Sequence, residues 1–220
     1  MSNEPKDVRE WLQGHSSDYA NVRHRLDICR NVMLNGRIDS AIDMLKKSYT
    51  FAVMSIRTNK DRHEDAFISH YKGRQHRKDA FLQTVYGGQK YGWDRKTHKN
   101  VDWEALVLSI RHHVKNNQYG KLLDIVVEKM TGVSHRKGSF MMAMIGLYEY
   151  MCIDSNVGRF ADIDVKRSYN SGNEYLEDCY QIARSVDTQN RPFVIQWAIY
   201  DIERGEHSRH MAFYREVLNL

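Results

Sequence analysis

Lys137 and Asp154 are the residues whose types and spacing best suit covalent chemistry. Lys137 stands at the start of a predicted apolar helix (137–147), where the positive end of the helix dipole and nearby apolar surface disfavour its protonated form. A neutral lysine can attack an electrophilic sugar carbon and form a Schiff base, which an arginine cannot do. A carboxylate beside it would stabilise an oxocarbenium-like sugar.

The spacing between the two residues allows them to meet. A helix rises about 1.5 Å per residue, so the far end of the helix lies roughly 16 Å from Lys137. The segment 148–153 is just long enough in extended form to return over that distance. Asp154 is also predicted to cap a new helix, which would hold its carboxylate ionised and fixed. The alternative is a solvated lysine and an aspartate that acts only as a cap.

A helical hairpin (about 119–147) precedes this return. Its first helix ends at Thr131-Gly132-Val133-Ser134, where Gly132 suits a left-handed conformation and Ser134 could cap the second helix. Backbone N–H groups of such a turn and of the following helix point at one spot and suit a phosphate oxygen. An ordinary helix turn is the alternative.

Nearly the whole chain has helical periodicity, so we expect an all-α fold. The predicted helices are 18–34, 38–57, 60–71, 75–85, 102–116, 119–130, 137–147, 155–160, 173–186, 191–204 and 207–219. The glycine-rich segment 86–93 is predicted to interrupt the helices and to join two packed lobes (1–92 and 93–220) of a single domain (1–220). The polar segment 161–172 is expected on the surface.

Composition sets the broad class. The net charge of +5 permits binding to a polyanion without proving it. The three cysteines are far apart and predict neither a disulfide framework nor a C-x-x-C metal site. With no membrane-spanning run and no signal-peptide pattern, we expect a cytoplasmic protein that contacts no membrane. That this protein is DNA-associated and acts as a monomer is implied by the resemblance of the motif described next.

A longer motif surrounds the candidate residues. It consists of Gly132-Val133-Ser134-His135-Arg136-Lys137-Gly138-Ser139-Phe140, then Ala143-Met144-Ile145-Gly146, and then Cys152-Ile153-Asp154-Ser155-Asn156-Val157-Gly158-Arg159. It resembles the endonuclease III-like superfamily of helix-hairpin-helix DNA glycosylases. That superfamily has a Gly-Val-Gly-type hairpin, a catalytic lysine at the next helix start and an essential aspartate in an Ile/Val-Asp-x-His/Asn-Val-like segment.

The resemblance implies a base excision repair enzyme that flips a damaged or mismatched base out of duplex DNA and excises it. Lys137 would be the nucleophile and Asp154 the essential acid, and a Schiff base would permit AP lyase activity by β-elimination. The hairpin residues implied to bind DNA are Gly132, Val133, Ser134, His135 and Arg136. The segment Phe51–Asp61 is similar to the early helix of the family, which implies that Arg57 and Thr58 fill the gap left by the flipped base.

The sequence departs from the family pattern in several places. Thr131 stands where proline is usual, and Ser134 replaces the second glycine. One alignment of the hairpin places Arg136 at the catalytic position, and lysine chemistry fails in that register. The Lys-Gly-Ser-Phe continuation, which is similar to some archaeal and phage-like members, favours Lys137.

No cofactor is expected, because the chain has no cysteine after Cys179 for the family's four-cysteine iron-sulfur loop. No metal is expected either, since His207 and His210 share a helix face but lack a third ligand, and His112 and His113 point to different faces. Trp197 is interpreted as core packing. The aromatic candidates for stacking on a base are Tyr91, Trp93, Tyr148 and Tyr150. The alternatives are a non-catalytic helix-hairpin-helix DNA-binding protein and a helical interaction scaffold, and the identity of the excised base stays open.

Overall fold

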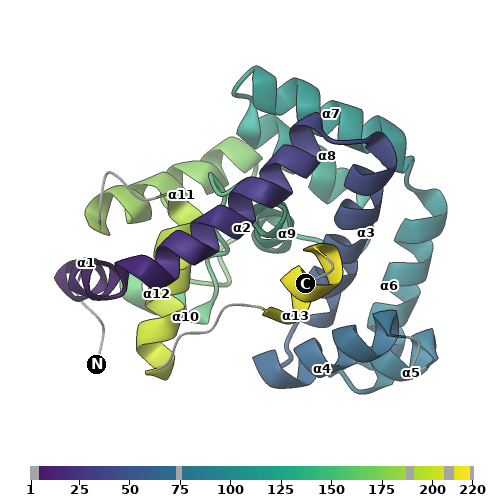
Figure 1. Ribbon diagram of the computed structural model, residues 1–220, viewed down its shortest axis with the longest axis horizontal. Helices are drawn as coiled ribbons and strands as arrows, with labels where there is room; N and C mark the ends of the chain where they lie inside the picture. Colours follow the sequence, from purple (N-terminus) through teal and green to yellow (C-terminus); the bar gives the residue numbers. More distant parts are fainter. Residues whose placement is uncertain (1–4, 73–75, 187–190, 206–210, 219–220) are drawn as a thin grey trace.

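The computed structural model describes residues 5–72, 76–186, 191–205 and 211–218, whose regular secondary structure is helical throughout (Figure 1). In chain order the helices are α1 (Pro5–Gly14), α2 (Ser16–Asn35), α3 (Ile38–Met54), α4 (Lys60–Tyr71), α5 (Arg77–Leu82), α6 (Gly87–Asn100), α7 (Trp103–Lys115), α8 (Tyr119–Lys129), α9 (His135–Met144), α10 (Ser155–Ala161), α11 (Gly172–Val186), α12 (Pro192–Arg204) and α13 (Met211–Leu218). The predicted all-α class is confirmed. None of the helices described is long and apolar enough to cross a membrane.

The core forms around α3, α9 and α12. Residues 48–54 of α3, 138–144 of α9 and 192–199 of α12 are all buried, and α3 packs directly against α9. A helix that is apolar nearly all round must lie inside the molecule. Figure 1 shows α9 near the centre, with α2 crossing in front of the core. The predicted burial of the helix after the hairpin is therefore confirmed.

The predicted helix break at 86–93 is wrong, because α6 runs through it. Tyr86 adopts a left-handed backbone conformation, with φ of 56°, just before the helix begins. A Cβ on Gly87 would come within 2.2 Å of the carbonyl oxygen of Phe81, so glycine is needed for the close approach. Gly87 thus allows the tight connection between α5 and α6. The boundary suggested between lobes 1–92 and 93–220 falls inside this continuous helix.

Helix α1 was not among the predicted helices, although its sequence contains a helical signal. Val8, Trp11 and Leu12 are spaced by three and four residues, and Val8 and Leu12 are buried. Elsewhere, residues 162–171 lie largely exposed outside helices, as predicted. Of the predicted helix 207–219, residues 207–210 and 219 lie outside the described residues, and α13 begins at Met211.

Candidate active site

The hairpin between α8 and α9 has the glycine-dependent turn that the sequence predicts. Gly132 has φ of 79°, and a Cβ there would come within 2.5 Å of the Trp93 ring of α6. Ser134 occupies the N-cap position of α9, but its side chain makes no capping hydrogen bond. The hydrogen bond from the Gly138 N–H to the Ser134 carbonyl closes the first turn of the helix at 2.7 Å. The N–H groups that precede it have no intrahelical acceptor, as in any helix first turn.

Lys137 lies in this first turn, because α9 begins at His135 and not at Lys137 as predicted. The side chain is partly buried and reaches back across the C-terminal end of α3. Its Nζ donates to the Ser55 hydroxyl at 2.9 Å and lies 5.2 Å from the centre of the Phe140 ring. The amine is therefore held in one place by a hydroxyl and an aromatic face.

Asp154 is the N-cap of α10, as the sequence predicts. Its Oδ1 accepts from the N–H groups of Asn156 and Val157 at 2.9 and 3.1 Å. Two backbone donors of this kind stabilise the anionic carboxylate and fix its orientation.

The segment before Asp154 is fastened to three helices. The Ser139 hydroxyl of α9 donates to the Met151 carbonyl at 2.7 Å. The Cys152 N–H donates to Gln196 of α12 at 2.7 Å, and the Ile153 N–H donates to the Tyr175 hydroxyl of α11 at 2.9 Å. These bonds hold the return segment against the core.

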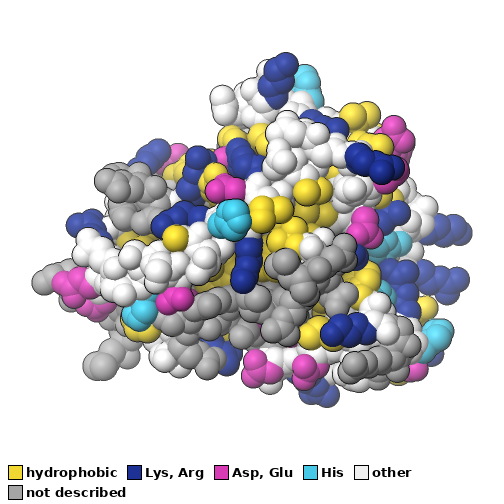
Figure 2. Space-filling model, viewed as in Figure 1, with side chains coloured by type: hydrophobic (Ala, Val, Ile, Leu, Met, Phe, Trp, Pro, Cys, Tyr) yellow, Lys and Arg dark blue, Asp and Glu magenta, His cyan; other side chains and the backbone are white. Residues whose placement is uncertain are grey.

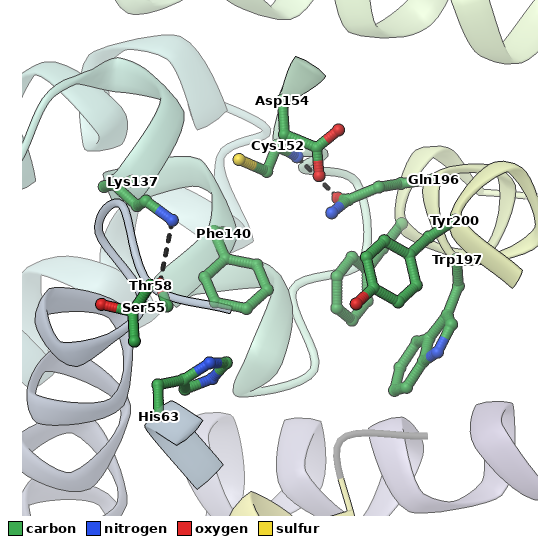
Figure 3. A pocket seen from close by; sticks show the side chains of 11 residues that line it. Ser55, Thr58, His63, Lys137, Phe140, Cys152, Asp154, Gln196, Trp197 and Tyr200 are labelled. Carbon is green, nitrogen blue, oxygen red and sulfur yellow. Dashed lines mark hydrogen bonds between the residues drawn. The ribbon is translucent and has the colours of Figure 1, made fainter. Parts of the chain in front are cut away.

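Lys137 and Asp154 line the same pocket, so the predicted return of Asp154 toward Lys137 is confirmed (Figure 3). The pocket has a volume of about 120 Å³. A cavity of roughly 150 Å³ accommodates benzene, so the pocket approaches the size needed for one small ring. The residues that line it are Ser55, Thr58, His63, Lys137, Phe140, Cys152, Asp154, Phe193, Gln196, Trp197 and Tyr200.

The side chains opposite Lys137 come mainly from α12 (Figure 3). Phe193, Trp197 and Tyr200 supply aromatic surface. The Gln196 amide is oriented by the Cys152 N–H, which donates to its Oε1 and leaves the amide nitrogen as a donor. Burial raises the pKa of the Cys152 thiol to about 12, so this thiol stays protonated and does not compete with the amine as a nucleophile.

The structure also distinguishes between the two alignments of the hairpin, which place either Arg136 or Lys137 at the catalytic position. Arg136 points away from the pocket, donates to the Arg167 carbonyl at 2.8 Å and lies over the Tyr169 ring at 5.5 Å. Of the neighbouring pair, only Lys137 lines the pocket. The geometry therefore favours the Lys137 register.

Not all of the hairpin side chains predicted to bind DNA face solvent. Gly132 and Ser134 are exposed, whereas Val133 is buried. His135 forms a close polar contact of 3.0 Å between its Nε2 and Asp124 of α8. The side chain of Val133 therefore packs in the core, and only its backbone could take the predicted part in a phosphate contact.

Arg57 and Thr58 lie on the turn that follows α3. Thr58 lines the pocket, and Arg57 is exposed beside it with φ of 51°. The Arg57 guanidinium lies 5.8 Å from the centre of the Tyr86 ring. A left-handed arginine costs energy that the surrounding structure must supply.

Lys90 of α6 supports this turn, and the sequence interpretation missed it. Its Nζ is buried and donates to the carbonyls of Met54 and Ile56 and, at 2.7 Å, to the Thr58 hydroxyl. Burial, and after it the positive charge of Lys137, lowers the pKa of Lys90 to about 8.

The aromatic candidates named from the sequence lie elsewhere. Trp93 packs on the hairpin turn, Tyr148 lies against Arg30 and Arg191, and Tyr150 is buried. None of the four, Tyr91 included, lines the pocket, whereas Trp197 is both buried, as predicted, and part of the pocket wall.

Metal-ligand candidates are few. Within the ranges described, no group of three His, Cys, Asp or Glu side chains is placed to hold a metal ion. His207 and His210 lie outside the described residues.

The sequence matches no protein-family model, and neither curated proteins nor solved structures gave a match to the chain. The site is accordingly interpreted from its own geometry.

Proposed function

We propose that this protein is a DNA glycosylase that excises a damaged or mismatched base, with associated β-elimination activity. One observation carries the proposal. The amine of Lys137 and the helix-capping carboxylate of Asp154 line a single aromatic pocket, next to the hairpin that turns at Gly132. The amine supplies a nucleophile, the carboxylate a fixed negative charge, and the pocket a space for one ring.

In this mechanism a nucleotide rotates out of the duplex and its base enters the pocket. The amine of Lys137 attacks C1′, and the N-glycosidic bond breaks with its electron pair leaving on the base, which takes up the proton that the attacking nitrogen loses. Ring opening gives a Schiff base between Lys137 and the sugar. Asp154 stabilises the positive charge that develops on the sugar. Loss of a C2′ proton then expels the 3′ phosphate, and water releases the lysine.

The walls of the pocket support recognition of a base. Phe140, Phe193 and Trp197 offer faces and edges for stacking, and the Gln196 amide nitrogen offers a donor to a carbonyl or ring nitrogen. The hairpin turn, in which Gly132 and Ser134 are exposed, and the start of α9 offer backbone N–H groups to a phosphate. A protein with this activity acts inside the cell on DNA.

Borohydride trapping tests the proposal, because reduction converts a Schiff base into a stable amine linkage. We expect a covalent adduct on a duplex from a lesion panel with the wild-type chain and none with Lys137→Ala or Lys137→Arg. The arginine variant keeps the charge but cannot form the imine. Arg136→Ala is the matched control and should retain trapping. An adduct that persists without Lys137, or no adduct on any lesion, would overturn the proposed lyase chemistry.

A further inference from the structure

Helix α6 has two faces of different character. Its buried residues are Gly87, Lys90, Asp94 and Thr97, whereas Arg95, Lys96 and Lys99 are exposed. Lys99 follows Lys96 by three positions and Arg95 by four, so both residues neighbour Lys99 on one side of the helix. Lys and Arg side chains gather at the right-hand edge of Figure 2, over α6. The name basic stripe is used below for Arg95, Lys96 and Lys99.

Residues on the inner side of α6, opposite the basic stripe, contact the candidate site. Lys90 holds the 54–58 turn at the pocket, as described above. The Thr97 hydroxyl accepts from the Thr131 N–H of the hairpin at 3.0 Å, and Trp93 packs against Gly132. The helix therefore fixes the stripe relative to both the pocket and the hairpin turn.

No exposed acidic residue of α6 neutralises the positive charge of the basic stripe. Asp94, the one acidic residue of α6, is buried, with Arg77 at 3.0 Å and His98 at 3.2 Å from its carboxylate. From Arg95 to Lys99 the helix rises roughly 6 Å. Each strand of a duplex carries about one phosphate charge per 3.4 Å of the axis, so this length spans about two to three phosphates of one strand.

We propose that the basic stripe of α6 docks the phosphate backbone of duplex DNA as an extension of the hairpin surface. The inference rests on the proposed function, since it assigns part of the DNA footprint to a helix outside the hairpin. Its contribution is independent of sequence and of the lesion, because the stripe binds charge and not base edges.

The test is a fluorescence anisotropy titration of a labelled undamaged duplex at several salt concentrations. The stripe variant is Arg95→Gln, Lys96→Gln and Lys99→Gln combined, which keeps helix-forming residues while removing the charge. The control removes the same charge at exposed positions on α7, α8 and α11: Lys115→Gln, Lys121→Gln and Arg184→Gln. Circular dichroism verifies that both variants are folded.

We expect the stripe variant to lose about tenfold or more in affinity at low salt. Its slope of log affinity against log salt should fall by about 2 to 3, or about one for each phosphate contact removed. The control should keep most of the wild-type slope. Equal losses in both variants, or unchanged binding by the stripe variant, would overturn the docking role while leaving Lys137 trapping intact. Absence of wild-type duplex binding even at low salt would overturn the stripe and the proposed function together.

Discussion

At Asp154, one carboxylate caps α10 and also faces the pocket. The cap explains why the side chain is fixed, since Oδ1 accepts two backbone N–H groups. The pocket position explains what a fixed charge could do there. The two roles can be separated because asparagine also caps helices but carries no charge.

We therefore expect Asp154→Asn to fold and to bind duplex DNA while base release slows by about 100-fold or more, as when a preorganised charge-stabilising group is lost. Single-turnover release of the base is the measurement. Asp102→Asn is the matched control, because Asp102 caps α7 through the Ala105 N–H away from the pocket. If Asp154→Asn releases the base at nearly the wild-type rate, Asp154 caps α10 but does not contribute its charge to catalysis.

Lys90 gives a second prediction at the residue scale, in the pH dependence of stability. Its folded-state pKa of about 8 lies below the ordinary value of 10.5. Between these pH values the unfolded chain binds a proton that the folded chain does not, so the contribution of Lys90 to stability rises with pH. Below about pH 8 both states are protonated and the cost of burying the charge is fully present.

The expected result is that the free energy of unfolding of the wild type, relative to Lys90→Met, increases from pH 7.5 to 9.5. Urea unfolding of both proteins at the two pH values measures this difference, and titrations common to both cancel. The variant should also be less stable at either pH, by about 1–3 kcal/mol for each buried carbonyl left without a donor. A difference that does not change with pH would show that Lys90 is not titrating in this range.

At the scale of elements, the hairpin depends on a glycine for two reasons that can be measured apart. Gly132 and Gly205 both have positive φ, but only at Gly132 would a Cβ meet another side chain, the Trp93 ring. Left-handed backbone alone costs an alanine about 1–2 kcal/mol.

Gly132→Ala should therefore lose more stability than Gly205→Ala and should also weaken duplex binding, because the ring contact must open and the turn must shift. Urea unfolding and anisotropy on the same preparations provide the comparison. If Gly132→Ala destabilises the protein no more than Gly205→Ala and leaves DNA binding unchanged, the turn is not part of the DNA-binding surface.

The hairpin and α6 differ in how much of them the sequence predicts. The hairpin is specified by local signals: an apolar run, a left-handed glycine and the capping aspartate at 154 all agree with the tertiary structure. The inner face of α6 is polar, with Lys90, Asp94 and Thr97 buried. Apolar periodicity gives no signal for such a face, because its partners are distant polar groups.

Some of the residues that line the pocket can likewise be predicted from local sequence, whereas others are placed by distant contacts. Lys137 and Asp154 lie close enough in sequence for helix length and reach to predict their meeting. Ser55, which follows α3, and Phe193 of α12 reach the pocket that Lys137 lines only through packing of the whole core. No local pattern contains that information, so the sequence does not indicate that these residues line the pocket.

At the scale of the whole molecule, the proposed function divides DNA binding into two parts with different physics. Phosphate contacts by the hairpin and other basic surface depend on counterion release and act on any duplex. Insertion of a base into the aromatic pocket depends on desolvation and stacking, which salt changes little. A damaged and an undamaged duplex share the first part and differ only in the second.

We accordingly expect the wild-type protein to bind a lesion-bearing duplex and an undamaged duplex with parallel slopes of log affinity against log salt, the lesion line lying above the other. The titrations use Lys137→Ala in place of the wild type to prevent turnover, and circular dichroism verifies that this variant is folded. Anisotropy between about 50 and 200 mM salt, a range over which phosphate-dominated binding falls steeply, gives both slopes. Lines that converge as salt rises would mean that lesion preference is itself electrostatic, and slopes near zero would remove the phosphate backbone from the interface. Parallel lines with a constant separation place the preference in the pocket, where Phe140, Phe193 and Trp197 meet the base.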